Sequence, residues 1–277
     1  MINTIVGRKV AIATNKPQTT RNLIQGIYND DEAQIVFVDT PGIHKPSNKL
    51  GAVLNRQAYY TFDSVDLVVL LVDGSQKLGK GDQFVIDRLK EVKKPVILVI
   101  NKIDKLSKEE VFEKICQYKE LYTFKEIIPL SAMKKRNIDE LIKVLKNYLP
   151  EGERMFEEEL YTNSSERFMV SEIIREKVFL KTEQEVPHSL TCVVEEMKFN
   201  RNSVSIIASV IVDRDSLKKI IIGARGSRIK EIGMEARSEI EELLGKKVYL
   251  ETYVRTIEKW RDREKYLQEF GYYDFEQ

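Results

Sequence analysis

Residues 95–104 read PVILVINKID, and this short stretch decides the class of fold. The apolar run at 96–100 has no polar position at which one face could meet water, so the strand it predicts is buried on both faces. Strands of that kind occur in parallel sheets that helices cover. The polar residues after the run place a loop at the carboxyl end of the strand, where open α/β sheets bind ligands.

Similar runs recur through the first half of the chain, with helical patterns between them. The runs are AQIVFVDT (33–40), DLVVLLVDG (66–74) and EIIPLSA (126–132), and the helical patterns fall at 82–93, 107–121 and 137–149. This alternation predicts an α/β domain over residues 1–150, with a parallel sheet and helices on both of its faces. Pro150 ends the last of these helices.

The second half of the chain has a different order of elements. Residues 151–167 are acidic and polar, which suits an exposed linker. Residues 168–277 then read as a helix (168–182), two strands (190–198 and 204–212), a helical stretch with an embedded glycine loop (215–243) and a final strand (246–254). We therefore expect a smaller α+β domain with a C-terminal helix, in which Trp260 packs rather than stacks on a base.

Composition predicts a soluble globular protein, since 42% of the 277 residues are hydrophobic and 32% are charged. The net charge of +1 hides an asymmetry: residues 1–150 hold 24 basic and 18 acidic side chains, and residues 151–277 hold 21 and 26. A nucleic-acid site must therefore rest on a local basic patch. We expect a cytoplasmic protein without a secretory signal, and the longest apolar run, at 65–72, is too short to cross a bilayer.

The loop after the 95–102 strand has the chemistry of guanine recognition. Asp104 can accept two hydrogen bonds from the ring N–H and the exocyclic amine of guanine, a pair that adenine does not offer. Lys102 can lay its aliphatic stem along the base, and Asn101 precedes it in the motif. Ser131 and Ala132 follow the next strand, where a backbone N–H can reach the guanine carbonyl. These five residues are the predicted nucleotide-base site.

A second loop, DTPG at 39–42, predicts contacts to Mg²⁺ and a terminal phosphate. Asp39 is placed to reach Mg²⁺ through water, and Gly42 lets a backbone N–H approach the phosphate without a side chain in the way. Thr20 lies upstream and can supply a hydroxyl ligand to the same ion. We expect these three residues to form the switch region and to have no single catalytic side chain among them.

The loop GARG, between two helical segments, has the form of a glycine-rich clamp for a nucleic-acid backbone. Basic residues concentrate around it, and apolar positions at 221, 222, 229 and 232 would line a groove for single-stranded bases. The predicted RNA-binding residues are Lys219, Ile222, Gly223, Ala224, Arg225, Gly226, Arg228 and Lys230.

Together these motifs resemble the Era family of bacterial GTPases. The resemblance rests on DTPGIHKP, NKID and SAM in the first half and on RFMVSEIIREKVFL, EVPHS and IIGARGSRIKEIG in the second, and it covers nearly the whole chain. It implies a P-loop-GTPase-like G-domain followed by an α+β type II KH domain, with GTP or GDP and Mg²⁺ as cofactors. It also implies a monomer that binds the 3′ end of 16S rRNA during assembly of the small ribosomal subunit, and a peripheral association with the inner face of the membrane.

The chain departs from the family pattern at its start. The family has a first strand and a glycine-rich phosphate loop before a segment that resembles MINTIVG, and that strand lies between the strands predicted here at 33–40 and 66–74. We expect the chain to be a fragment, or to begin at a start codon assigned too late, and as written to hydrolyse GTP weakly or not at all. Ile43 after DTPG also cannot orient a water as a glutamine would. The alternative is a nucleotide-independent RNA-binding protein with a remnant G-domain.

Overall fold

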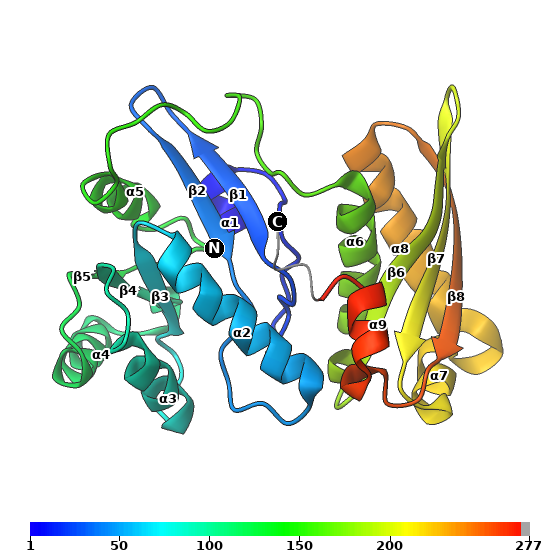
Figure 1. Cartoon of the computed structure of the whole chain (residues 1–277), viewed down its shortest axis with the longest axis horizontal. Coiled ribbons are helices and arrows are strands. Elements are labelled where there is room, and N and C mark those ends of the chain that lie inside the picture. The colour runs from blue at the N-terminus through cyan, green and yellow to red at the C-terminus, as the bar shows by residue number, and fades with distance from the viewer. Residues whose placement is uncertain (273–277) are drawn as a thin grey trace. The chain divides into compact units, whose positions relative to one another are not determined.

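The structure is a computed structural model that describes residues 1–272, and its chain divides into two compact units (Figure 1). The first unit holds Met1–Lys9, Leu23–Lys45 and Asn55–Thr162, and the second holds Val10–Asn22, Pro46–Leu54 and the chain from Asn163 on. The change near residue 162 falls inside the expected linker. Two short segments of the amino-terminal half, however, belong with the second unit, which the sequence did not predict. The domain boundaries at 150 and 168 stay a prediction.

The amino-terminal half runs α1 (Ile2–Val6), β1 (Ile24–Asn29), β2 (Gln34–Asp39), α2 (Lys49–Ser64), β3 (Val68–Asp73), α3 (Lys80–Leu89), β4 (Val96–Asn101), α4 (Lys108–Leu121), β5 (Glu126–Pro129) and α5 (Ile138–Lys146). The remainder runs α6 (Glu166–Lys181), β6 (Leu190–Phe199), β7 (Ser203–Val212), α7 (Asp215–Ile222), α8 (Ser227–Leu244), β8 (Lys247–Thr256) and α9 (Glu264–Glu269). Within residues 1–272, no helix is both long and apolar enough to cross a membrane.

Strand β4 is buried on both faces, as its sequence predicts. It lies between β3 and β5 in a three-stranded parallel sheet. Ile97 and Val99 pack with α5, whereas Leu98 and Ile100 pack on the opposite face with α3 and α4. Because helices cover both faces of the sheet, every side chain of the run at 96–100 is buried, and each position of the run is therefore apolar.

Strand β2 corrects part of the sequence prediction. It was expected in the parallel sheet, but it pairs antiparallel with β1, a strand that the sequence analysis did not predict. Asp30 explains the hairpin, because its side chain accepts hydrogen bonds from the N–H groups of Glu32 and Ala33 at 3.0 and 2.9 Å and so shapes the turn. Within the described residues β2 and β3 are not paired with each other.

The second unit has the order α6-β6-β7-α7-α8-β8 around one three-stranded sheet. Strands β6 and β7 are antiparallel, and β7 and β8 are parallel. The helices α6, α7 and α8 pack on one face of this sheet, against alternate residues such as Val210 and Val212. This is the α+β domain that the sequence predicted.

One end of the opposite face of that sheet is covered by a second apolar cluster. Ile211, which points away from the helices, packs there with Trp260, Leu267 and the segment Pro46–Leu54. The side chain of Trp260 is fully buried, and its indole N–H donates to the carbonyl of Ser189 at 3.1 Å. The prediction that this tryptophan packs is therefore confirmed.

Candidate functional site

The five residues predicted to bind guanine meet at the carboxyl ends of β4 and β5. The side-chain oxygen of Asn101 accepts hydrogen bonds from the backbone N–H groups of Lys102, at 2.8 Å, and Ala132, at 3.0 Å. One amide group thus joins the two loops, which local sequence could not show. Lys102 adopts a left-handed backbone conformation with φ 65°, and this turn starts the short 3₁₀ segment Ile103–Lys105.

Asp104 is oriented by the loop that follows β5. The hydroxyl of Ser131, itself completely buried, donates to a carboxylate oxygen of Asp104 at 2.5 Å. This hydrogen bond lowers the pKa of Asp104, so the carboxylate stays ionised at neutral pH. An ionised, oriented and partly exposed carboxylate can accept hydrogen bonds from two neighbouring N–H groups of a ligand.

Lys102 is held across the end of the sheet by an ion pair. Its ammonium lies 2.6 Å from a carboxylate oxygen of Asp73 at the end of β3. Gly74 lets these strand ends approach, since a Cβ there would lie 2.9 Å from Ile100 Cγ2 and 3.1 Å from the carbonyl oxygen of Asn101. The ion pair stretches the lysine along the edge of the sheet, and this orientation suits the predicted contact of its stem with a flat base.

The DTPG loop lies in the same unit as the guanine residues. Asp39 ends β2, and Gly42 is exposed, with no atom within 4 Å of the place that a Cβ would occupy. Asn55 of α2 anchors His44, two residues after Gly42, because the Asn55 amide donates to the carbonyl of His44 at 2.6 Å. The hydrogen bond thus fixes the chain just after the DTPG loop, while Gly42 remains exposed to solvent.

Thr20 is placed differently from the sequence prediction. It belongs to the segment Val10–Asn22 of the second unit, whereas Asp39 belongs to the first. The structure thus does not bring the two expected Mg²⁺ ligands into one unit, and their pairing stays a prediction. Within residues 1–272, no group of three or more His, Cys, Asp or Glu side chains could hold a metal ion.

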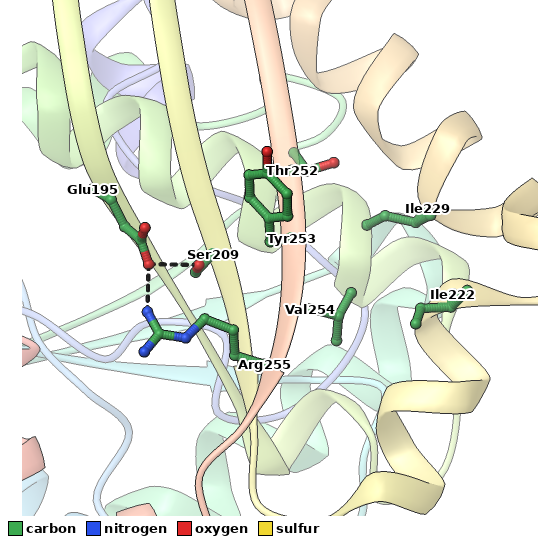
Figure 2. Close-up of a pocket in the computed structure, with 8 residues that line it drawn as sticks. All are labelled: Glu195, Ser209, Ile222, Ile229, Thr252, Tyr253, Val254 and Arg255. Atoms are coloured by element: carbon green, nitrogen blue, oxygen red, sulfur yellow. Dashed lines mark hydrogen bonds and ion pairs between the residues drawn. The ribbon is translucent and has the colours of Figure 1, made fainter.

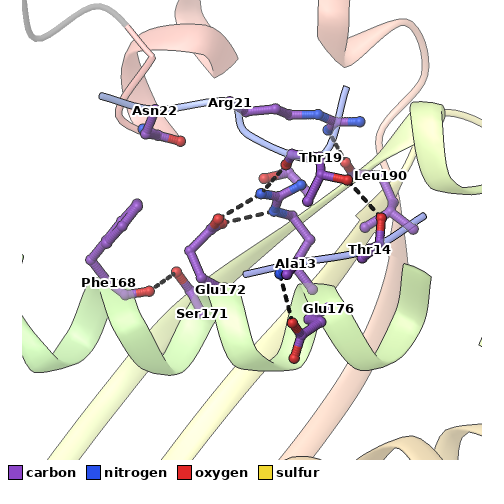
Figure 3. Close-up of polar contacts among 12 residues, drawn as sticks. Ala13, Thr14, Thr19, Arg21, Asn22, Phe168, Ser171, Glu172, Glu176 and Leu190 are labelled. Carbon is purple, nitrogen blue, oxygen red and sulfur yellow. Dashed lines mark hydrogen bonds and ion pairs between the residues drawn. The ribbon is translucent and has the colours of Figure 1, made fainter. Parts of the chain in front are cut away.

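Buried charges hold the Val10–Asn22 segment against α6 (Figure 3). Arg175 forms an ion pair with Glu172 at 2.5 Å and donates to the carbonyl of Thr19 at 2.6 Å. Glu176 accepts a hydrogen bond from the backbone N–H of Ala13 at 2.9 Å. Arg21, only 2% exposed, donates to the carbonyls of Pro187 and Leu190.

The sequence itself contains a signal for this docking. Glu172, Arg175 and Glu176 follow one another at helical spacing in α6, and all three are at most 5% exposed. The other buried residues of this helix are apolar. Buried charges require partners, because desolvation of an unpaired ion is costly. Charges at 172, 175 and 176 therefore indicated that another segment covers this face of α6.

The glycine loop in the second unit needs both of its glycines, for different reasons. Gly223 has φ 72° and ψ 179°, and a Cβ there would lie 2.8 Å from Arg228 Cβ. Gly226 has φ 78° and begins α8 in a left-handed conformation with open space around it. Between them Ala224 and Arg225 are exposed. Such a loop presents backbone to a ligand at the start of a helix, as a clamp for a phosphate backbone requires.

The basic residues around the loop differ in their exposure to solvent. Lys219 and Lys230 are exposed. Arg228 is partly buried, and its guanidinium donates to the carbonyl of Ile220 near the end of α7. Arg228 therefore supports the loop, while the lysines and Arg225 face solvent, where they can contact phosphate.

A groove of about 450 Å³ lies beside this loop (Figure 2). Ile222 and Ile229 line it on the helix side, as predicted, together with Thr252 and Val254 of β8. The expectation for Ile221 and Ile232 was wrong, because both are 0% exposed and belong to the core. Ile221 and Ile222 are neighbours on α7 and point about 100° apart, so only one of them could face the groove. Ile232 lies almost one turn beyond Ile229 on α8 and packs in the core under the sheet.

Comparison with known protein families finds a match in each half of the chain. The family described as 50S ribosome-binding GTPase matches residues 1–102, and the KH domain family matches residues 185–261. The chain is thus a G-domain protein with a KH domain.

The relatives of the whole chain are more specific. GTPase Era of Clostridioides difficile (strain 630) is 47% identical over 277 residues, which cover 99% of this chain and 93% of the relative. The chain belongs to the Era family of GTPases. A crystal structure of Era with MgGDPNP and nucleotides 1506–1542 of 16S rRNA matches with a TM-score of 0.94 and 39% identity, over 98% of this chain and 93% of that one. A variant of Aquifex aeolicus Era bound to GDP and AlF₄⁻ matches with a TM-score of 0.93 and 40% identity over the same shares.

Proposed function

We propose that this protein binds guanine nucleotide with its first unit and the 3′ end of 16S rRNA with its second, and that it acts in assembly of the small ribosomal subunit. The observation that carries the proposal is the closed set of contacts around Asp104, which leaves an ionised carboxylate fitted to guanine. The groove beside GARG supports the RNA half, and the family structure with GDPNP and 16S rRNA supports the pairing of the two ligands.

Each predicted residue has a role in this proposal. Asp104 accepts the two N–H groups of guanine, and Lys102 covers the base. The N–H of Ala132 donates to Asn101 in this structure and would exchange that acceptor for the guanine carbonyl when the nucleotide binds. Asn101 and Ser131 position them. In the second unit Gly223 to Gly226 clamp the RNA backbone, Ile222 contacts a base, and Lys219, Arg225 and Lys230 contact phosphates, while Arg228 holds the loop.

For Mg²⁺, Asp39 offers the oxygen donor that this ion prefers, and Gly42 leaves its backbone N–H accessible to a phosphate. Mg²⁺ in nucleotide sites takes few protein ligands and several from water and phosphate, so one carboxylate and one hydroxyl are sufficient. Thr20 would supply the hydroxyl. Since Thr20 lies in a segment that buried charges hold in the second unit, we propose that nucleotide binding and this docking compete for the segment. GTP hydrolysis belongs to the same proposal and should be slow, because Ile43 offers no side-chain hydrogen bond to water.

The Asp104→Asn variant tests the guanine site. An amide presents one donor and one acceptor where guanine offers two donors, so GTP binding should weaken at least about a hundredfold while xanthosine triphosphate gains. Asp87→Asn, the same change at an exposed position on α3, is the control. Binding of both triphosphates is measured by equilibrium dialysis. An unchanged preference for GTP in Asp104→Asn would contradict the assignment.

The same variant separates the proposal from its alternative, a nucleotide-independent RNA-binding protein. If the nucleotide controls the RNA half, GTP should alter RNA affinity in the wild type and not in Asp104→Asn. Equal RNA affinity with and without GTP in the wild type would favour the alternative. The proposed monomer is checked by light scattering, and the proposed peripheral membrane association by flotation with anionic vesicles.

A further inference from the structure

The face of the second unit's sheet that points away from the helices is largely uncovered along its edge strand. Tyr249, Glu251, Tyr253 and Arg255 alternate along β8 with residues that point toward the helices, and all four are exposed. The apolar cluster around Trp260 covers the end of this face at Ile211. A polar and aromatic surface therefore lies beside that cluster.

This surface is continuous with the GARG groove around the edge of β8 (Figure 2). The groove is lined by Ile222 and Ile229 on the helix side, and also by Tyr253 and Arg255 on the opposite face. Strand β8 pairs with β7 alone, so no further strand among the described residues separates the two sides. A nucleic-acid strand bound in the groove can thus cross this edge and stay in contact with the protein surface.

A fixed polar group lies beside Tyr253. One carboxylate oxygen of Glu195, Oε1, accepts hydrogen bonds from Ser209 Oγ at 2.7 Å and from Arg255 Nη1 at 2.6 Å. Its other oxygen accepts no hydrogen bond from residues 1–272. Ser209 is 1% exposed and anchors the carboxylate from the sheet, whereas the Arg255 side chain is 57% exposed and leaves further N–H groups toward solvent. The pair offers an acceptor and a donor side by side.

The ring of Tyr253 is half exposed and oriented. Its hydroxyl donates to Glu251 Oε2 at 2.7 Å, which orients the ring along the strand while half of the residue's surface stays exposed. Exposed aromatic rings on a sheet are the platforms on which proteins stack single-stranded bases. A protein partner would require a desolvated apolar centre, and Glu195, Ser209 and Arg255 surround this ring with polar groups instead.

We propose that the RNA strand in the GARG groove continues over the edge of β8 and that one of its bases stacks on Tyr253, where Glu195 and Arg255 select adenine or cytosine over uracil. Adenine and cytosine present an amino donor next to a ring-nitrogen acceptor, which matches the free oxygen of Glu195 and an N–H of Arg255. Uracil presents an acceptor and a donor in the opposite places. This inference rests on the proposed RNA-binding function of the same unit.

The test measures affinity for a fluorescent RNA of 16S rRNA nucleotides 1506–1542 by anisotropy, with the full chain. Tyr253→Ala should weaken binding by about 5- to 150-fold, the effect of losing one stacked base. Tyr253→Phe keeps the ring and should bind as the wild type does. Tyr60→Ala is the matched control, since Tyr60 is an exposed tyrosine of the first unit.

Two further readouts distinguish stacking from simple loss of charge or of fold. The slope of log affinity against log salt should be unchanged in Tyr253→Ala, whereas Lys219→Ala should lower it by about 0.7, the value for one phosphate contact to a single strand. Glu195→Gln should reduce the preference of the protein for adenylate and cytidylate decamers over uridylate decamers. The fluorescence of Trp260, buried in the same unit, reports whether each variant is folded.

The outcomes separate the inference from the proposed function. If the wild type binds the 16S fragment and Tyr253→Ala binds it equally well, the stacking site is wrong and the RNA-binding function stands. If Tyr253→Ala loses affinity but Tyr253→Phe loses it equally, the hydroxyl and not stacking is responsible, which also overturns the inference. If the wild type binds none of the RNAs, the proposed function itself fails.

Discussion

The substitution Gly223→Ala should destabilise the second unit by about 2–6 kcal/mol. The backbone at Gly223, with φ 72° and ψ 179°, lies in a region that other residues adopt at a cost of about 1–3 kcal/mol. The added Cβ would also lie 2.8 Å from Arg228 Cβ and 3.1 Å from the Arg228 backbone nitrogen. Neither atom is the end of a flexible side chain, so α8 must move, at a further cost of about 1–3 kcal/mol.

Gly226→Ala is the matched control, because it isolates the backbone effect. Gly226 has a similar φ of 78°, but no atom lies within 4 Å of its would-be Cβ. A left-handed alanine there should cost about 1–2 kcal/mol and nothing more. The difference between the two variants therefore measures the collision with Arg228 together with the extra backbone cost of ψ 179° at Gly223.

Urea unfolding followed by fluorescence measures both values. The chain has one tryptophan, Trp260, which is fully buried in the second unit and so reports on that unit. The midpoint of the Gly223→Ala transition should fall further than that of Gly226→Ala, with the slope unchanged. Equal midpoints for the two variants would refute the steric reasoning, and the loop would then be free to relax around an added methyl group.

Three other substitutions follow from the contacts described above. Gly74→Ala should destabilise the first unit by about 1–3 kcal/mol in thermal unfolding, because its Cβ meets Ile100 and the end of β4, and an unchanged midpoint would contradict this close packing. Arg175→Met should cost about 3–5 kcal/mol, because it leaves Glu172 buried without its partner, and the double variant with Glu172→Met should recover most of this in urea unfolding. The pKa of Asp30 lies well below its ordinary value: burial opposes the shift, but the hydrogen bonds from Lys146, from Tyr28 and from the backbone N–H groups of Ala33 and Glu32 together outweigh it. Its stabilisation is therefore present above the unfolded pKa of about 3.9 and lost as pH falls toward the folded pKa, so Asp30→Asn should show a shallower loss of stability between neutral and acidic pH than the wild type does.

Features that depend on neighbours in the chain were predictable from the sequence. The run at 96–100 could only be a strand buried on both faces, and the motif after it could only be a loop at the strand's carboxyl end. The glycines at 223 and 226 marked positions where the backbone takes a positive φ, a property of each residue alone. The Asx turn at Asp30 was also local, and attention to it would have predicted the β1–β2 hairpin.

Features that depend on contacts between distant parts of the chain were not predictable from the sequence. Ile221 and Ile222 are equally apolar, and only the packing of α7 on the sheet sends the first into the core and the second to the groove. The Asn101 amide joins two loops through a hydrogen bond from Ala132, 31 residues away, which no local pattern reveals.

The chemical groups of the predicted guanine and RNA sites could be named from short motifs, because the members of each motif are adjacent and its backbone conformation is local. Only the tertiary structure decided where Thr20 lies. Its segment is held by buried side chains of α6, more than 150 residues further along the chain. Arg175 and Glu176 lose their hydrogen bonds to water on burial and replace them with hydrogen bonds to the backbone of residues 13 and 19. That exchange is a property of the folded chain, and no stretch of sequence contains it.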